Sequence, residues 1–315
     1  MQHYHAIEEV SLQSSWLTIG AFDGVHRGHQ EIIARLVAAA KADASPAAVL
    51  TFFPHPLAVL RGLDGPFYLT HPDERARLLG ALGVDAVITL PFTRQVAATS
   101  AAEFMHRLKA HLDLRTLLIG HDFALGRGRE GTPECLRALG ETLGYTVRLV
   151  SPVVDGDQIV SSTRIRTLLA NDGNVAEAAG LLGRPYRLQG EVIRGAARGR
   201  TLGFPTANIA FWPEQILPAN GVYACRALWQ GKAWAAATNI GLRPTFNGEK
   251  ALATEAYLLD FTGDLYGEQV TLEFIQRLRG EEKFSSIEAL IEQIRQDVRE
   301  TRQIFQTGSP KAAFA

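Results

Sequence analysis

The hydrophobic pattern of this 315-residue chain changes once, close to Tyr186, and this change constrains the fold more than any other feature. Before it, short β-rich runs alternate with stretches of helical periodicity, and after it apolar residues recur at every second position. Alternation of strand and helix predicts an α/β fold with a parallel sheet, whereas a period of two predicts a small antiparallel barrel or sandwich. Residues 183–185, with the sequence Gly-Arg-Pro, mark the boundary. We therefore expect two domains, 1–184 and 185–315.

The two halves are predicted to differ in their elements. In the first half, strands are expected at 16–19, 48–53, 86–90, 116–119 and 146–150. Helices are expected at 28–41, 72–82, 100–111, 134–143 and 163–170, followed by a short one that ends at 182. In the second half, strands are expected at 222–229, 233–240, 254–261 and 270–275. A closing helix with one apolar face is indicated by Ser285 and Glu288 in capping-box spacing.

The charge balance argues against nucleic acid as a partner. The chain has 32 basic and 33 acidic residues, and neither half carries a basic excess that would bind polyanions in general. No apolar run approaches the roughly 18 residues of a membrane span, and the N-terminus lacks the pattern of a secretory signal. We therefore expect a cytoplasmic protein with no membrane partner, with Cys135 and Cys225 as ordinary buried thiols. The oligomeric state is left open.

The strongest local motif is GAFDGVHRGH at residues 20–29, where a predicted strand ends and a helix begins. In a parallel α/β sheet this edge binds ligands, because helix N-terminal amides and the helix dipole favour phosphate. His26 and His29 share a face at the helix start and can both donate to phosphoryl oxygens. An isolated pair of this kind is more often a helix cap or a surface pair, but the glycine turn before it favours a ligand site. The candidate nucleotide-binding residues are Gly20, Phe22, Asp23, Gly24, His26 and His29.

A second candidate phosphate site is VSSTRIR at residues 160–166. Hydroxyls and guanidinium groups gather there at a helix start, which suits a triphosphate. The alternative is a capped surface helix. The candidate nucleotide-binding residues are Ser161, Ser162, Thr163, Arg164 and Arg166.

The second half carries GEVIRGAARGRTLGFPTAN at residues 190–208. If 205–209 is extended, Thr206 and Asn208 point the same way and offer a hydroxyl and an amide oxygen, which Mg²⁺ accepts alongside phosphates. A plain turn is the alternative for a Thr/Asn pair next to a proline. The candidate nucleotide-binding residues are Gly199, Gly203, Pro205, Thr206 and Asn208, of which Thr206 and Asn208 are also the candidate metal ligands.

The motif at 20–29 resembles the HxGH motif of nucleotidyltransferases, and the two halves together resemble the bifunctional bacterial riboflavin kinase/FAD synthetases. The matching segments run from residue 20 to about 299 and include SSTRIR, GRTLGFPTAN, GVYA, NIGLRPTF, LYG and RGEEKF. The resemblance implies a Rossmann-like nucleotidyltransferase domain followed by a six-stranded riboflavin kinase barrel. It also implies that riboflavin and ATP give FMN and ADP, and that FMN and ATP give FAD and pyrophosphate, both with Mg²⁺. Asp122 and Phe123, in the segment GHDFALG, are the candidate flavin-binding residues.

The two reactions make different chemical demands. In the kinase step a ribityl hydroxyl must lose a proton, and the second half has no histidine to accept it. Glu255 shares a predicted strand face with Tyr257, Leu259 and Phe261, and a charge on an otherwise apolar face needs a reason. The resemblance gives the same residue the role of base. In the adenylylation step the attacking FMN phosphate is already ionised. His26 and His29 are therefore expected to stabilise developing charge.

This chain departs from the family pattern at three positions. Ala124 and Leu125 stand where the family has the basic and aromatic residues of D-F-R-F-G, and Tyr257 replaces a histidine. A contact from the first of these sites is therefore weakened or moved. Two other functions stay open: an adenylyltransferase for another cofactor precursor, which would have no use for the second half, and a flavin carrier that consumes no ATP.

Overall fold

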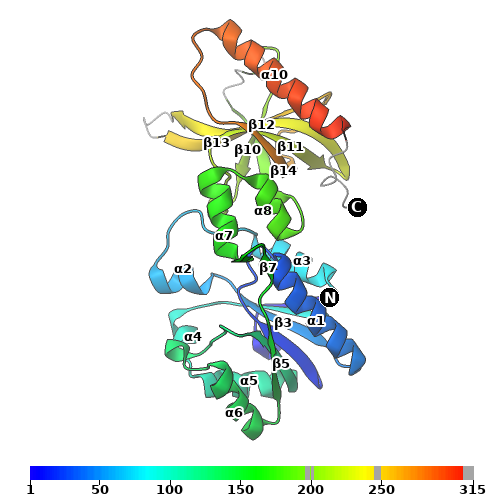
Figure 1. Ribbon diagram of the computed structural model, residues 1–315, viewed down its shortest axis with the longest axis vertical. Helices are drawn as coiled ribbons and strands as arrows, with labels where there is room; N and C mark the ends of the chain where they lie inside the picture. Colours follow the sequence, from blue (N-terminus) through cyan, green and yellow to red (C-terminus); the bar gives the residue numbers. More distant parts are fainter. Residues whose placement is uncertain (196–198, 200–201, 245–249, 308–315) are drawn as a thin grey trace. The chain divides into compact units, whose positions relative to one another are not determined.

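The computed structural model describes residues 1–195, 199, 202–244 and 250–307, and the chain forms two compact units, Met1–Ser162 and Thr163–Ala315. Each unit has its own sheet, and Figure 1 labels their elements. The short helices after Thr163 group with the barrel of the second unit. The division of the two activities at residues 184 and 185 remains a prediction.

The first unit contains a six-stranded sheet in which all neighbouring strands are parallel, as the alternating pattern predicts. In spatial order the strands are β1 (Gln2–Tyr4), β4 (Ala86–Leu90), β3 (Ala47–Phe52), β2 (Ser15–Ile19), β5 (Leu114–Gly120) and β6 (Thr146–Val150). The strand β1 has only three residues and shows no pattern in the sequence. The order of the strands reverses between β2 and β5, so the loop that follows β2 lies at the topological switch point where such sheets bind ligands.

Helices cover both faces of this sheet because its buried strands send apolar side chains to either side. On one face α1 (Arg27–Ala42) and α3 (Pro72–Ala81) pack against Val49 and Val87. On the other, α5 (Ala101–Leu112) and α6 (Pro133–Leu143) pack against Leu50 and Ile88 (Figure 1). The remaining elements are the helices η1 (Ile7–Glu9), α2 (Pro56–Arg61), α4 (Arg94–Ala98) and η2 (Arg127–Arg129) and the hairpin strands β7 (Val154–Asp155) and β8 (Gln158–Ile159).

The second unit is built around a closed antiparallel barrel of six strands, which decides between the barrel and the sandwich. In barrel order the strands are β10 (Ala207–Phe211), β13 (Lys250–Leu258), β12 (Lys232–Pro244), β11 (Gly221–Trp229), β14 (Gln269–Arg279) and β9 (Tyr186–Ile193). Leu188, Tyr223 and Phe274 are buried in its core. The strand expected at 254–261 ends earlier, at Leu258, because Asp260 takes a left-handed backbone with φ of 57° and starts a turn.

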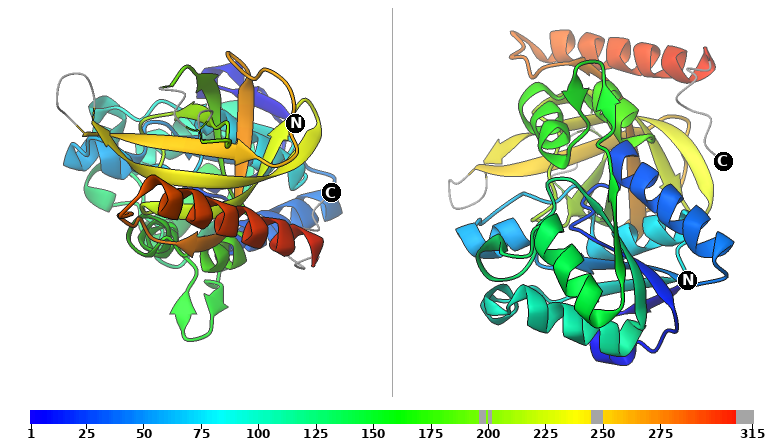
Figure 2. Two further views of the ribbon diagram at one scale, coloured as in Figure 1. Left: turned by 90° about the horizontal axis from the view of Figure 1, so that it is seen from above. Right: turned by 60° about the horizontal axis from the view of Figure 1, so that its bottom comes forward.

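Helices pack on the outside of the barrel (Figure 2). The segment α7 (Ser162–Thr167), η3 (Leu168–Asp172) and α8 (Val175–Leu182) reaches β9 and β14 through α8. The long helix α10 (Ile287–Gln306) packs on β11 and β12, where Asp297 forms a buried ion pair with Arg279 at 2.8 Å. The expected cap of this helix is corrected by one residue: the hydroxyl of Ser286, not that of Ser285, accepts from the backbone N–H of Ala289.

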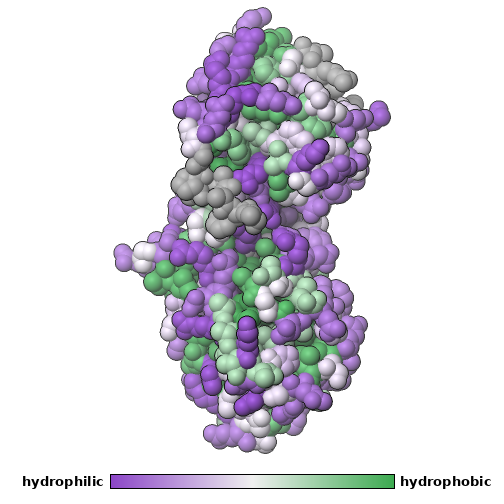
Figure 3. Space-filling view, turned by 90° about the vertical axis from the view of Figure 1, so that its right-hand side faces the viewer, coloured by the Kyte–Doolittle hydropathy of each residue, from purple (hydrophilic) through white to green (hydrophobic). Residues whose placement is uncertain are grey.

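Hydrophilic and hydrophobic residues are interspersed over the face of the molecule shown in Figure 3. Among the residues that the structure describes, no helix is long and apolar enough to cross a membrane.

A fragment that begins at Thr163 is expected to be more stable than one that begins at Gly183. The shorter fragment lacks α8, whose five buried side chains include Leu181 and Leu182. Loss of a buried leucine side chain costs about 2–5 kcal/mol, so the free energy of unfolding should fall by at least about 3 kcal/mol, as measured by urea denaturation. Equal midpoints for the two fragments would show that α8 is not part of the second folding unit.

Candidate active sites

Asp23 anchors the loop between β2 and α1 through hydrogen bonds of its buried carboxylate. Its carboxylate is buried and accepts hydrogen bonds from the backbone N–H groups of Leu69 (3.0 Å) and Thr70 (3.1 Å). Gly24, with φ of 84°, donates its own N–H to the Thr70 hydroxyl at 3.1 Å. The predicted position of the glycine loop at the strand edge is confirmed, and Asp23 holds this loop against residues 69–70.

The two predicted histidines lie together at the start of α1. Their rings stack with centroids 3.6 Å apart and an interplanar angle of 19°, and the edge of Phe22 meets His29 at 5.1 Å. His26 is nearly buried and is also the N-cap of the helix, because its Nδ1 accepts from the backbone N–H of His29 at 3.4 Å. His26 is therefore a helix cap, which was one of the two alternatives for this pair. Both rings nevertheless lie at the ligand edge of the sheet.

The second phosphate segment is divided between the two units. Ser162 belongs to the first unit and donates its hydroxyl to the Asp23 carbonyl at 2.8 Å, which joins the end of this segment to the β2–α1 loop. Arg164, in the second unit, forms an ion pair with Glu177 of α8 at 2.9 Å. The shared triphosphate cradle therefore remains a prediction for Ser161, Ser162, Thr163, Arg164 and Arg166.

Sequence reasoning missed the neighbouring loop, which follows β3. His55 is nearly buried and caps α2 by accepting the N–H of Leu57 at 3.0 Å. Leu57 and Leu60 are 40% and 61% exposed, which leaves apolar surface at the ligand edge of the sheet. The signal was present in the sequence TFFPHP at residues 51–56, where a histidine follows a buried strand.

The candidate flavin residues Asp122 and Phe123 follow β5 at the same edge. Asp122 is exposed, and its carbonyl accepts from Arg129 Nη2 at 3.1 Å. The Phe123 ring is partly buried against the core, and so is Leu125 at one of the departures from the family pattern. The guanidinium of Arg129 thus lies beside the segment at residues 122–125, in which this chain lacks the basic residue of the family pattern.

In the barrel, Glu255 lies between two asparagines. It stands directly opposite Asn208 of β10 and directly opposite Asn239 of β12. Such pairs have Cβ atoms about 4.5–5.5 Å apart on one face of a sheet. Because the adjacent Ala256 is fully buried in the core, Glu255 and both asparagines lie on the outer face of the barrel. Of the residues expected on the same strand face as Glu255, Tyr257 shares that face, whereas Leu259 and Phe261 lie beyond the end of β13. The neighbours of Glu255 across the strands are polar amides, and strand periodicity alone could not pair Asn239 with it.

The rival carboxylate Asp260 has a different environment. It lies beyond the end of β13 and forms two hydrogen bonds with Arg302 of α10, at 2.6 and 2.9 Å. The Arg302 guanidinium lowers the pKa of the exposed Asp260 below its ordinary value. This carboxylate is thus held in a surface ion pair away from the row of Asn208, Glu255 and Asn239.

Gly195 and Gly199 lie close to the candidate metal ligands. A Cβ at Gly195 would lie 2.2 Å from the Asn208 amide nitrogen, and one at Gly199 would lie 3.1 Å from the Thr206 hydroxyl. The carbonyl of Gly199 also accepts the N–H of Phe204 at 2.8 Å. Residues 196–198 and 200–201 of this segment lie outside the described part of the chain. The metal-binding role of Thr206 and Asn208 and the nucleotide-binding role of the glycines remain predictions.

Comparison with protein families matches each half of the chain to a different model. Residues 8–164 match the FAD synthetase family, and residues 182–305 match the riboflavin kinase family. The bifunctional riboflavin kinase/FMN adenylyltransferase of Escherichia coli K12 is 37% identical over 97% of each chain. That of Pseudomonas fluorescens is 40% identical over 91% of this chain and 92% of its own.

One solved structure matches nearly the whole chain. It is described as a macrolide-efflux protein from Streptococcus pneumoniae, is 33% identical, and aligns with a TM-score of 0.86 over 96% of this chain and 98% of its own. The likeness therefore extends over both units.

Proposed function

The chain belongs to the bifunctional riboflavin kinase/FMN adenylyltransferase family. We propose that the barrel phosphorylates riboflavin with Glu255 as the base, and that the parallel-sheet unit adenylylates FMN with His26 and His29 as donors to the phosphoryl oxygens. The single observation that carries the kinase assignment is the placement of Glu255 directly between Asn208 and Asn239 on the outer face of the barrel. Riboflavin, FMN, FAD and ATP are the substrates and products of this bifunctional family.

In the kinase step Glu255 takes the proton from the ribityl hydroxyl as that oxygen attacks the γ-phosphorus of ATP, the bond from this phosphorus to the β–γ bridging oxygen breaks, and ADP leaves. The amides of Asn208 and Asn239 can donate to the carboxylate or to the substrate from either side.

We assign the divalent metal ion of the kinase step to Thr206 and Asn208, and we propose that it is Mg²⁺. Their hydroxyl and amide oxygens are hard ligands, and the glycine backbone at residues 195 and 199 leaves room for no side chain beside them. When bound, the metal ion neutralises charge on the transferred phosphoryl group.

In the adenylylation step an FMN phosphate oxygen attacks the α-phosphorus of ATP and pyrophosphate leaves. His26 and His29 donate to the phosphoryl oxygens, and the N-terminus of α1 adds its dipole to their effect. The exposed leucines of α2 offer an apolar surface for the flat flavin ring, and Asp122 and Phe123, in the segment that follows β5, offer its second contact. Asp23 shapes this loop through its bonds to residues 69–70.

We also propose that the protein works in the cytoplasm. Both of its cysteines are free thiols, which fits a reducing compartment; Cys225 is buried as expected, whereas Cys135 is only partly buried. Fractionation of the cells that make it tests this placement, and recovery with secreted proteins would oppose it.

One incubation tests the proposed function. Purified protein is mixed with riboflavin, ATP and Mg²⁺, and the flavins are separated by chromatography over time. FMN should appear first and FAD after it. Binding of flavin without consumption of ATP would indicate a carrier, and FMN without FAD would point to a different acceptor for the adenylyl group.

Removal of the metal ion is expected to abolish both reactions. With EDTA in excess, the rates of FMN and FAD formation should fall to background, and Mg²⁺ should restore both. In a Thr206→Val variant the kinase reaction should need a higher Mg²⁺ concentration, because one oxygen ligand is lost, while the Mg²⁺ dependence of FAD formation stays unchanged. An unchanged Mg²⁺ dependence of the kinase in this variant would remove Thr206 from the metal site.

A further inference from the structure

Arg75 is a fully buried arginine beneath the ligand edge of the parallel sheet. It lies on α3 with no exposed surface. Its guanidinium donates from Nη1 to the Ala21 carbonyl at 3.0 Å and from Nη2 to the Phe52 carbonyl at 2.9 Å. Ala21 belongs to the β2–α1 loop and Phe52 is the last residue of β3, so this one side chain joins the two loops that carry the histidines of the site.

The charge of Arg75 is not matched by an ion pair. Within the described residues it forms no salt bridge, and its Nε has no hydrogen-bond partner. Burial lowers the pKa of Arg75, while the nearby Asp23 carboxylate opposes that effect. That carboxylate is itself occupied by the N–H groups of Leu69 and Thr70. A cation that is buried and bonded only to carbonyls is costly for the fold, because water has been lost without a full counter-charge.

Such a cation becomes favourable when an anion binds at the same edge. In a buried, low-dielectric setting a charge acts over a longer distance than it does in water. The planar fork of arginine can also hold two carbonyls at once, which the single point charge of a lysine does less well. Arg75 therefore combines two properties that an ATP site can use: fixed geometry in both loops and positive potential behind them.

We propose that Arg75 is a positioning residue for adenylylation, which holds the β2–α1 and β3–α2 loops in register and provides buried positive charge that the triphosphate of ATP balances. This inference rests on the proposed location of the ATP site at His26 and His29. It extends that site to a residue that does not touch the reacting atoms.

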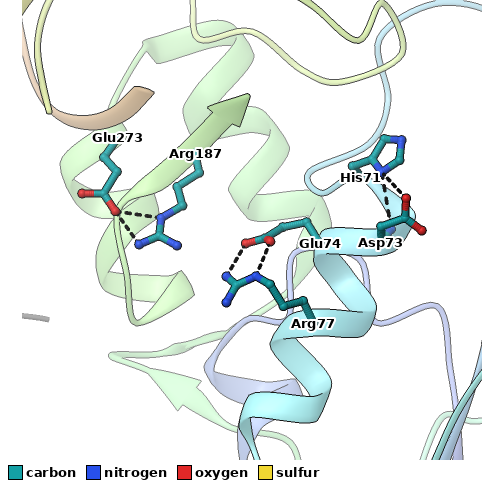
Figure 4. A network of polar contacts seen from close by, with 6 residues as sticks. All are labelled: His71, Asp73, Glu74, Arg77, Arg187 and Glu273. Carbon is teal, nitrogen blue, oxygen red and sulfur yellow. Dashed lines mark hydrogen bonds and ion pairs between the residues drawn. The ribbon is translucent and has the colours of Figure 1, made fainter. Parts of the chain in front are cut away.

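A matched control lies two residues further along the same helix. Arg77 carries the same charge but is exposed, and its guanidinium is held by Glu74 through bonds of 2.6 and 2.8 Å (Figure 4). Replacing Arg77 by methionine changes the net charge of α3 as much as replacing Arg75 does. It leaves the two loops untouched.

The test compares Arg75→Met, Arg75→Lys and Arg77→Met in the full-length protein, with kcat and KM for ATP measured separately for FAD formation and for riboflavin phosphorylation. Loss of hydrogen bonds from a charged donor predicts a KM for ATP in FAD formation that is roughly tenfold higher or more in Arg75→Met. Arg75→Lys should lie between this value and the wild type, because it keeps the charge and loses the fork. Arg77→Met should match the wild type, and the kinase constants should stay unchanged in all three variants.

An Arg75→Met protein with normal KM and a kcat reduced only by its misfolded fraction would overturn the proposal and leave Arg75 a purely structural residue. If Arg75→Met does not fold, Arg75→Lys decides: a raised KM for ATP supports the proposal and an unchanged one overturns it. His29→Ala in parallel separates the two levels of inference. Normal FAD formation in His29→Ala would refute the location of the site itself, whereas loss there with normal kinetics in Arg75→Met would refute only the role of Arg75.

Discussion

Replacing Glu255 by glutamine is expected to lower the rate of riboflavin phosphorylation by roughly 10² to 10⁴-fold, the range for loss of a general base. Glutamine keeps the size of the side chain and its place between Asn208 and Asn239, but it cannot take the ribityl proton. The KM for riboflavin should therefore change little. FAD formation from added FMN should continue at the wild-type rate, because its site lies in the first unit.

The control for this variant is Asp260→Asn. Asp260 is the nearest carboxylate that follows the same strand, but it is exposed and paired with Arg302. Loss of an exposed ion pair costs little stability, so kinase turnover should stay near normal. Near-normal turnover in Glu255→Gln together with loss in Asp260→Asn would show that this chain uses a different base. The test is informative because Tyr257 replaces a histidine of the family pattern, so the site of this chain differs from that pattern close to Glu255.

Replacing His29 by alanine is expected to lower FAD formation by roughly 10²-fold or more, as for loss of one donor to a developing negative charge. FMN formation should change little. Because the attacking phosphate needs no deprotonation, the wild-type rate should not follow the titration of a single histidine between about pH 6 and 8. A sharp rise over that range that disappears in His29→Ala would indicate base catalysis.

His26 needs a different substitution because it also caps α1. Asparagine is a good N-cap residue, so His26→Asn keeps the helix end and removes only the ring. FAD formation should fall in this variant also, with little change in stability. His106→Ala, at an exposed position on α5, is the control and should leave both reactions unchanged.

Hydrophobic periodicity predicted the strands of the sheet except β1 and the strands of the barrel except β9 and β10. The buried strands β2, β3, β4 and β5 alternate with amphipathic helices, so both their existence and their parallel arrangement follow from local pattern. The end of β13 did not follow, because the apolar Leu259 and Phe261 continue the strand pattern on either side of Asp260, where the backbone turns. The placement of α8 with the barrel also depends on contacts that no local pattern contains.

The candidate sites also could be predicted only where their residues are close together in the sequence. The motif at residues 20–29 located the histidines, because both lie within a few residues of the helix start. The partners of Glu255 could not be found in this way: Asn208 and Asn239 lie on two other strands, and only the register of the closed barrel brings them beside it. Arg75 gave no signal at all, since a charged residue on an amphipathic helix is normally expected at the surface.

The central claim is that one chain carries two independent sites, and a crossed assay of two variants tests it most directly. Glu255→Gln and His29→Ala are each supplied with riboflavin and, separately, with FMN, in the presence of ATP and Mg²⁺. The account predicts opposite losses: Glu255→Gln makes FAD from FMN but almost nothing from riboflavin, whereas His29→Ala accumulates FMN from riboflavin and makes almost no FAD from either flavin. A single substitution that abolished both reactions in a folded protein would contradict it.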